Sequence, residues 1–270
     1  MKTQVCAWGI IIGLVVAMSV SICPAAPIAT ITDEDSTASF DLGGGTGMYS
    51  WAIGDVEHLA QQWFWYRVGS TGGERAIDTL GSRFHGTTDA NFDGDHETLY
   101  VRYEDGQLRV TVMFVLNGAE PGNPSADIAE SIQITNLTSG TMDLHFFQFG
   151  DFDLGGTATD ESVRILDARG ARQEDIGFYA SEVVLTPRAD HWQADSAQTI
   201  FSNLNDGLPT TLTDAAGPVG PGDLGWAFQW DRTLRGGESF LISEDKQIVP
   251  EPITMSLIAV GGVVLLRRKK

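Results

Sequence analysis

The chain has 270 residues, of which 42% are apolar, and this is enough to bury a sizeable hydrophobic core. Its mean hydropathy of −0.05 excludes a protein with many membrane spans. The formal net charge is −19, and residues 30–249 contain 35 acidic against 12 basic residues, with Lys246 the single lysine. Because a body this acidic cannot gain affinity from counterion release on DNA or RNA, the composition excludes nucleic-acid binding.

Residues 1–25 are predicted to be a secretory signal peptide. Lys2 gives a positively charged start, an apolar run of signal-peptide length follows, and small residues come next. Signal peptidase is therefore an expected partner, cutting after Ala25 or as late as Ala29, and an uncleaved anchor is the alternative. Both cysteines lie in the first 23 residues, so the exported body has none for a disulfide, a thiolate metal site or a nucleophile.

Residues 30–248 are predicted to form one all-β domain. Short runs rich in aromatic and β-branched residues recur between Gly, Asn, Asp and Pro, and no window keeps helical periodicity over three turns. We expect an antiparallel β-sandwich that is jelly-roll-like, flanked by the N-terminal signal helix and a short C-terminal transmembrane helix. The predicted strands are residues 36–42, 48–53, 62–68, 98–103, 108–116, 129–136, 142–149, 162–166, 182–186, 225–230 and 239–242.

The strand at residues 62–68 contains two tryptophans, Trp63 and Trp65, that share one face, with Phe64 and Tyr66 on the other. If exposed, the two tryptophans would be glycan contacts, because sugar rings stack on aromatic surfaces. The alternative is a central strand buried on both faces, in which all four side chains belong to the core. The pattern favours the core.

An acidic loop between two predicted strands has oxygen-bearing side chains at alternate positions and a glycine at the turn. This is typical of the start of a calcium-binding loop. Tyr100 stands where an EF-hand has its bidentate glutamate, so only a loop of another type would fit. The alternative is an ordinary Asn/Asp/Gly turn. The candidate calcium ligands are Asp89, Asn91, Asp93, Asp95 and Glu97.

A second acidic cluster follows the predicted strand at residues 142–149. Asp151 and Asp153 alternate, and Asp160 and Glu161 come after two glycines. Such carboxylates can act as general acid and base or bind calcium, and the alternative is a solvated acidic surface. The chain contains no zinc-protease histidine spacing, nucleophile elbow or phosphate loop, so we do not expect an enzyme.

The last 22 residues combine three features: VPEP at residues 249–252, an apolar run at 253–266, and RRKK at the end. As a helix the apolar run spans about 21 Å, which is short for a hydrocarbon core of about 30 Å. The positive-inside rule predicts that the basic residues stay in the cytoplasm and stop the helix in the membrane. These membrane-stop residues are Arg267, Arg268, Lys269 and Lys270.

This tail resembles the PEP-CTERM sorting signal of Gram-negative bacteria, in which a Pro-Glu-Pro motif, a short hydrophobic helix and a basic terminus follow in this order. The resemblance covers about 22 residues. It implies that an exosortase, a membrane cysteine protease, recognises Pro250, Glu251 and Pro252. It also implies export across the inner membrane, a transient C-terminal anchor, and a final location at the cell surface or outside the cell.

We therefore expect an exosortase-sorted protein of the cell surface or extracellular matrix, structural or binding in role and associated with exopolysaccharide. One alternative is a calcium-dependent carbohydrate-binding module or lectin. A second alternative is a glycan-acting hydrolase that uses Asp151 or Asp153. Calcium is the cofactor that the acidic loops suggest.

Overall fold

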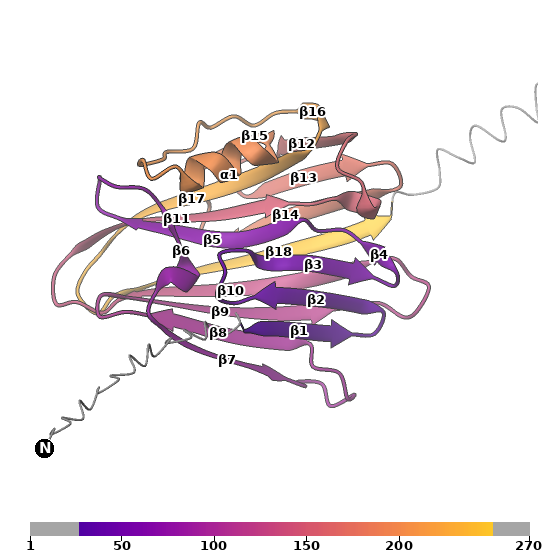
Figure 1. The fold of residues 1–270 in the computed structure, drawn as a ribbon, viewed down its shortest axis with the longest axis horizontal. Coiled ribbons are helices and arrows are strands. Elements are labelled where there is room, and N and C mark those ends of the chain that lie inside the picture. The colour runs from indigo at the N-terminus through magenta and orange to yellow at the C-terminus, as the bar shows by residue number, and fades with distance from the viewer. Residues whose placement is uncertain (1–26, 251–270) are drawn as a thin grey trace, which may run out of the picture.

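The computed structural model describes residues 27–250, which form two antiparallel sheets packed face to face (Figure 1). The two-sheet β-sandwich expected from the sequence is confirmed. The predicted signal peptide, Glu251, Pro252 and the basic terminus lie outside the described residues.

The first sheet, called sheet A, has nine strands in the path β1-β2-β3-β5-β11-β17-β15, with β4 beside β3 and β6 beside β5. Its strands are β1 (Ile28–Asp33), β2 (Ser36–Asp41), β3 (Gly47–Ile53), β4 (Val56–Glu57), β5 (Gln61–Val68), β6 (Arg75–Ala76), β11 (Met142–Asp151), β15 (His191–Ser196) and β17 (Leu224–Leu234).

The second sheet, called sheet B, also has nine strands, in the order β16-β12-β13-β14-β18-β10-β9-β8-β7. Its strands are β7 (Ser82–Thr88), β8 (Thr98–Glu104), β9 (Leu108–Asn117), β10 (Ala126–Asn136), β12 (Glu161–Ile165), β13 (Gly170–Asp175), β14 (Phe178–Thr186), β16 (Val219–Gly222) and β18 (Ser239–Pro250).

The strand order departs from the jelly-roll expectation. A jelly roll has eight strands arranged as two Greek keys. Here β7, β8, β9 and β10 are successive neighbours within sheet B, and β12, β13 and β14 are too. Sheet B is therefore built largely from hairpins of consecutive strands.

The core lies between the sheets and follows the alternation seen in the sequence. In β9 every second residue is fully buried, including Val110, Val112 and Phe114, while Met113 between them is 41% exposed. Phe114 reaches across to sheet A, where its ring lies 6.3 Å from that of Phe64 and 4.8 Å from that of Phe40. The sandwich is thus closed by large aromatic side chains from both sheets.

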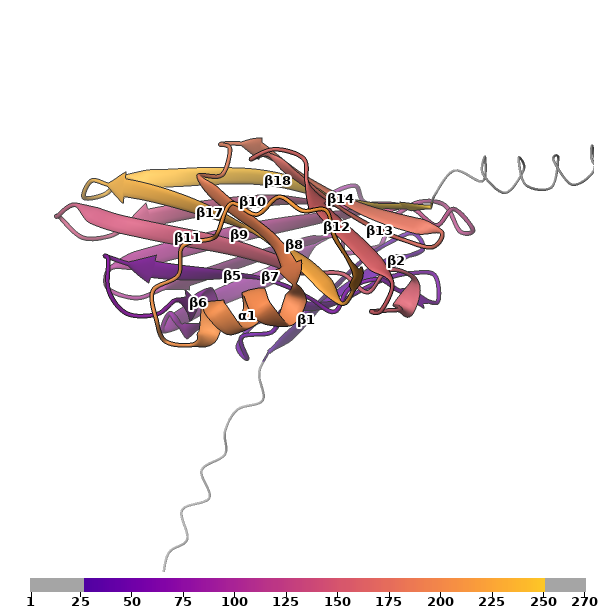
Figure 2. The same cartoon turned by 90° about the horizontal axis from the view of Figure 1, so that it is seen from above.

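The outer face of sheet A is covered in part by the helix α1 (Ala197–Asn205), as Figure 2 shows. Two 3₁₀ turns, η1 (Ile77–Thr79) and η2 (Leu154–Gly156), complete the elements. Within residues 27–250 no helix is both long and apolar enough to cross a bilayer.

Both ends of the sandwich extend past the boundaries expected from the sequence. Strand β1 begins at Ile28, and β18 ends at Pro250, which pairs with Phe178 of β14. Pro250 is therefore the last residue of a paired strand, two residues past the expected end of the domain at residue 248.

Candidate functional site

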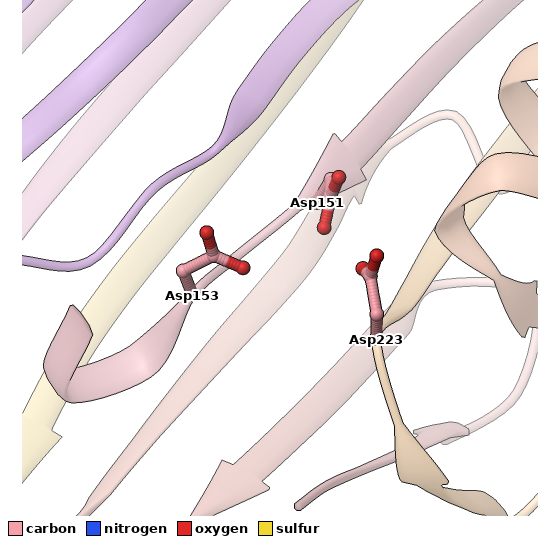
Figure 3. A group of neighbouring side chains, drawn as sticks. All are labelled: Asp151, Asp153 and Asp223. Carbon is pink, nitrogen blue, oxygen red and sulfur yellow. The ribbon is translucent and has the colours of Figure 1, made fainter. Parts of the chain in front are cut away.

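Three aspartates meet at one end of sheet A. Asp151 is the last residue of β11, Asp153 precedes η2, and Asp223 is the single residue between β16 and β17. One carboxylate oxygen from each lies within 4.8 Å of the others, and Figure 3 shows the three side chains turned toward one another. Among the described residues, this is the one group of three acidic, histidine or cysteine side chains close enough to share a metal ion.

The pairing of β11 with β17 brings Asp223 to this place. Asp151 lies opposite Gly225, so Asp223 falls just beyond the paired residues, beside the end of β11. A Cβ atom on Gly225 would lie 2.7 Å from the backbone oxygen of Gly150. A glycine is therefore required at residue 225 for the two strands to approach this closely.

Burial and neighbouring charges raise the pKa of Asp151 and of Asp153. Burial, followed by the charges of Asp223 and Asp153, raises the pKa of Asp151 to about 8. Burial and the charges of Asp223 and Glu57 also raise the pKa of Asp153. The Oδ1 atom of Asp151 is buried and accepts no hydrogen bond from the described residues. A site with this excess of negative charge favours either a bound proton or a bound cation.

Glu161 adds a fourth acidic group near the cluster. It is fully buried, its carboxylate accepts a hydrogen bond from the Leu154 backbone N–H at 3.2 Å, and its Oε2 has no hydrogen-bond partner among the described residues. Burial raises the pKa of Glu161 to about 8, and the nearby charge of Asp153 contributes to the shift.

A hollow of about 240 Å³ opens beside the aspartates, between the end of sheet A and the first turn of α1. The hydroxyl of Ser196 caps this helix by accepting a hydrogen bond from the Thr199 backbone N–H at 3.2 Å. Carboxylates, amides and aromatic rings together are the groups that bind sugar hydroxyls and sugar faces. The hollow is lined by Gln61, Phe149, Asp151, Ala197, Gln198, Phe201 and Asp223.

The sequence analysis found part of this site. It singled out Asp151, Asp153 and Glu161, but it also grouped them with Asp160, which is exposed and not part of the three-carboxylate cluster. It missed Asp223, which is 70 residues from Asp153. No local motif marks Asp223, and only the pairing of β11 with β17 would have revealed it.

The loop at residues 89–97 uses its acidic side chains to order its own backbone. Asp89 accepts hydrogen bonds from the backbone N–H groups of Phe92 at 2.6 Å and Gly94 at 3.1 Å. Glu97 accepts one from Ala90 at 2.7 Å, and Asp93 accepts one from Asp95 at 2.9 Å. These contacts are those of an Asx-type turn. Calcium binding by Asp89, Asn91, Asp93, Asp95 and Glu97 stays a prediction.

The interpretation of Trp63 and Trp65 as glycan contacts is wrong, because both side chains are completely buried. The Trp65 ring lies 6.1 Å from Phe201 of α1, and its indole N–H donates to Asn205 Oδ1 at 3.3 Å. The Trp63 indole N–H donates to Asp78 of η1 at 3.0 Å. Alternation along β5 indicated that the two side chains share a face, and α1 and η1 cover them there.

No known protein-family model matches the chain, and no curated protein matches it either. Solved structures match its fold. A bacterial glucoamylase complexed with acarbose aligns over 82% of this chain and 32% of its own length, with a TM-score of 0.56 and 8% identity. A polysaccharide lyase aligns over 83% and 32%, with a TM-score of 0.44 and 11% identity.

A galactose mutarotase-like protein from Lactobacillus casei aligns over 82% of this chain and 100% of its own, with a TM-score of 0.40 and 11% identity. The chain spans about a third of the length of the glucoamylase and of the lyase. At 8% identity, the likeness to the glucoamylase shows the fold alone, a sandwich of antiparallel sheets.

Proposed function

We propose that the protein is an exported, calcium-dependent carbohydrate-binding protein and that saccharide binds in the hollow beside Asp151, Asp153 and Asp223. One observation carries this proposal. Three carboxylate oxygens lie within 4.8 Å of one another at the edge of a hollow that also presents amide and aromatic side chains.

The chemistry of the donor set fits calcium. Calcium takes six to eight oxygen ligands, which include carboxylates, carbonyls and hydroxyls. The three aspartates would supply the negative charge, and sugar hydroxyls would complete the oxygen shell. Phe201, which is half-buried at the rim, would offer an apolar surface to the sugar ring.

The likeness to the glucoamylase is one of fold, and it makes saccharides the first ligand class to examine. Within the same proposal, the sorting tail implies export, cleavage by signal peptidase, processing by an exosortase and a final place among exopolysaccharides. Replacing Glu251 by alanine and measuring the C-terminal mass of the surface-exposed protein tests the sorting step. If the wild-type protein keeps Lys270 and the variant behaves identically, exosortase processing is wrong.

The binding proposal is tested by titrating the protein with a panel of neutral oligosaccharides by calorimetry, in calcium and in EDTA. We expect binding in calcium that EDTA abolishes, and we expect Asp223→Asn to abolish it as well. Asp160→Asn is the matched control, because Asp160 is an exposed acidic residue outside the cluster. Binding that survives both EDTA and Asp223→Asn would contradict the proposal.

A glycan-acting hydrolase is the second candidate function, and one observation favours it. Burial and the neighbouring charges raise the pKa of Asp151 to about 8, so this carboxyl holds a proton at neutral pH beside Asp223. A protonated carboxyl next to a second carboxylate is the arrangement that glycosidases use. Incubating the protein with polysaccharides and measuring released reducing ends tests this, and turnover unchanged in Asp151→Asn would exclude it.

A further inference from the structure

The outer face of sheet B from β7 to β18 differs from the rest of this acidic protein. Cross-strand neighbours share a face, so the pairing registers define three rows of residues across these strands. One row contains Glu104, Arg109, Thr135 and Ser239. The second contains Phe84, Arg102, Thr111, Gln133 and Leu241. The third contains Gly86, Tyr100, Met113, Ser131 and Ser243.

These rows form an open surface, called the β7–β18 face. Phe84 is 59% exposed, Leu241 50% and Met113 41%. Strand β7 pairs only with β8 and ends the sheet, so the face has a free edge at β7. Sheet A is different, because α1 lies against its outer side (Figure 2).

The charge of the β7–β18 face is positive, although acidic residues outnumber basic ones almost threefold between residues 30 and 249. Glu104 is the one acid in the three rows, and Arg109 binds it with a distance of 2.6 Å between Nε and Oε2. Arg102 Nε lies 3.9 Å from the same carboxylate, so two arginines share one acid and the three rows carry a net charge of +1. The next acid on this face is Asp245, one row further along β18.

An aromatic pair lies beside Arg102. The rings of Phe84 and Tyr100 are 6.1 Å apart and nearly perpendicular, and the Arg102 guanidinium lies over the Phe84 ring at 5.9 Å. A hollow of about 210 Å³ opens between Arg83, Phe84, Arg102 and Glu104. Threonine and serine hydroxyls and the amide of Gln133 occupy much of the remaining surface.

We propose that the β7–β18 face binds an acidic polysaccharide, with a uronate carboxylate at Arg102 and a sugar ring against Phe84. An arginine fork and a carboxylate form strong, oriented hydrogen bonds, and an aromatic ring next to the arginine holds the apolar side of a sugar. Charges are screened beyond about 8 Å at physiological ionic strength. A ligand bound on this face therefore interacts mainly with the charges of the face itself. The acidic residues around the face repel an anionic ligand and so restrict its binding to this face.

This site goes beyond the proposed function, because it uses other residues, binds acidic instead of neutral saccharides and needs no cation. The experiment titrates oligogalacturonate hexamers, and neutral maltohexaose as the control, into the full chain in EDTA. We expect binding of the acidic hexamer alone. Arg102→Gln should lower the affinity about tenfold, the loss expected for one charged hydrogen bond. Phe84→Ser should lower it about tenfold as well, because the sugar ring loses its apolar contact.

Arg164→Gln is the matched control variant, because Arg164 is an exposed arginine of sheet B that lies 3.6 Å from Glu174, outside the β7–β18 face. It should bind like the wild type. Equal affinity for the two hexamers, or unchanged affinity in Arg102→Gln, overturns the inference. Binding that depends on Asp223 and not on Arg102 overturns it too, while the proposed function stands. Failure of the calcium-dependent site alone leaves binding in EDTA intact.

Discussion

The ammonium of Lys246 lies 2.8 Å from Glu130 Oε1 in the space between the two sheets, and both side chains are at most 2% exposed. Glu244 and Glu182 lie 3.2 and 3.7 Å from the same nitrogen. Glu182 also accepts hydrogen bonds from Gln148, at 3.1 Å, and from the indole N–H of Trp226. One buried cation thus faces three buried carboxyl groups, and this imbalance ties the stability of the fold to protonation.

Replacing Glu130 by glutamine should weaken the pH dependence of stability. Burial raises the pKa of Glu130 to about 7, although Lys246 opposes the shift. The pKa of Glu130 in the folded protein is thus above its ordinary value of about 4.5. The proton on Glu130 therefore stabilises the folded state fully below pH 4.5, and this stabilisation is lost as the pH rises through about 7. We expect the wild-type free energy of unfolding to fall across this window, by at most about 3 kcal/mol from this group.

Urea unfolding of both proteins between pH 4.5 and 8 measures this difference, and Glu120→Gln, at an exposed position, is the control. Identical pH profiles for the wild type and Glu130→Gln would refute the assignment.

Replacing Lys246 by methionine should destabilise the protein by about 3–5 kcal/mol at pH 8, because the three carboxyl groups lose their one cation. The loss should be smaller at pH 5, because burial raises the pKa of Glu130 to about 7 and that of Glu244 well above its ordinary value, so protons replace charges at these two groups. Chemical denaturation at the two pH values provides the measurement, with the exposed Arg235→Met as control. A loss that is equal at both pH values would mean that the charge of Lys246 has no part in it.

Calcium should stabilise the protein more at pH 9 than at pH 6. The pKa of Asp151 is raised to about 8, so the proton on this carboxyl stabilises the fold fully below its ordinary pKa of about 4, and this stabilisation is lost as the pH rises through about 8. A cation competes with that proton and replaces it at high pH. Melting curves in calcium and in EDTA at both pH values test this. A calcium effect that persists in Asp151→Asn and Asp223→Asn would place the ion elsewhere.

Alanine at residue 47 should destabilise the fold far more than alanine at residue 45. Both glycines have left-handed backbones, with φ of 70° at Gly47 and 78° at Gly45, so each substitution carries a strain of about 1–2 kcal/mol. A Cβ at residue 47 would also lie 2.2 Å from the Trp63 ring, whereas one at residue 45 meets nothing within 4 Å. We expect the overlap to add about 1–3 kcal/mol to Gly47→Ala alone. Equal losses in denaturant unfolding would show that Trp63 can move aside.

The strands could be predicted because their alternation is local. The buried residues of β9 and β10 follow the period-two pattern of the sequence, and both strands lie close to their predicted bounds. The cover of sheet A could not be predicted in the same way. Helix α1 is nine residues long, too short for periodicity over three turns, and it decides that Trp65 is buried.

The residues of the candidate site also fall into those that local sequence patterns predict and those that only strand pairing brings together. Asp151 and Asp153 are marked by their position after a strand, whereas Asp223 joins them only through the pairing of β11 with β17, which no local pattern specifies. Similarly, Arg102 and Phe84 become neighbours through the register of β7 with β8. Contacts between segments far apart in the chain therefore create both the three-aspartate cluster and the β7–β18 face. Such contacts cannot be predicted from local patterns in one sequence.

Strand β18 lies in the middle of sheet B, between β14 and β10, although it is the last strand in chain order (Figure 1). While residues 239–250 are still inside the ribosome, β10 and β14 each present an unpaired edge, and the carboxyl groups of Glu130 and Glu182 have no lysine. Sheet B therefore cannot close during synthesis. The emerging chain must be kept from pairing with other chains until almost the whole described domain has been released.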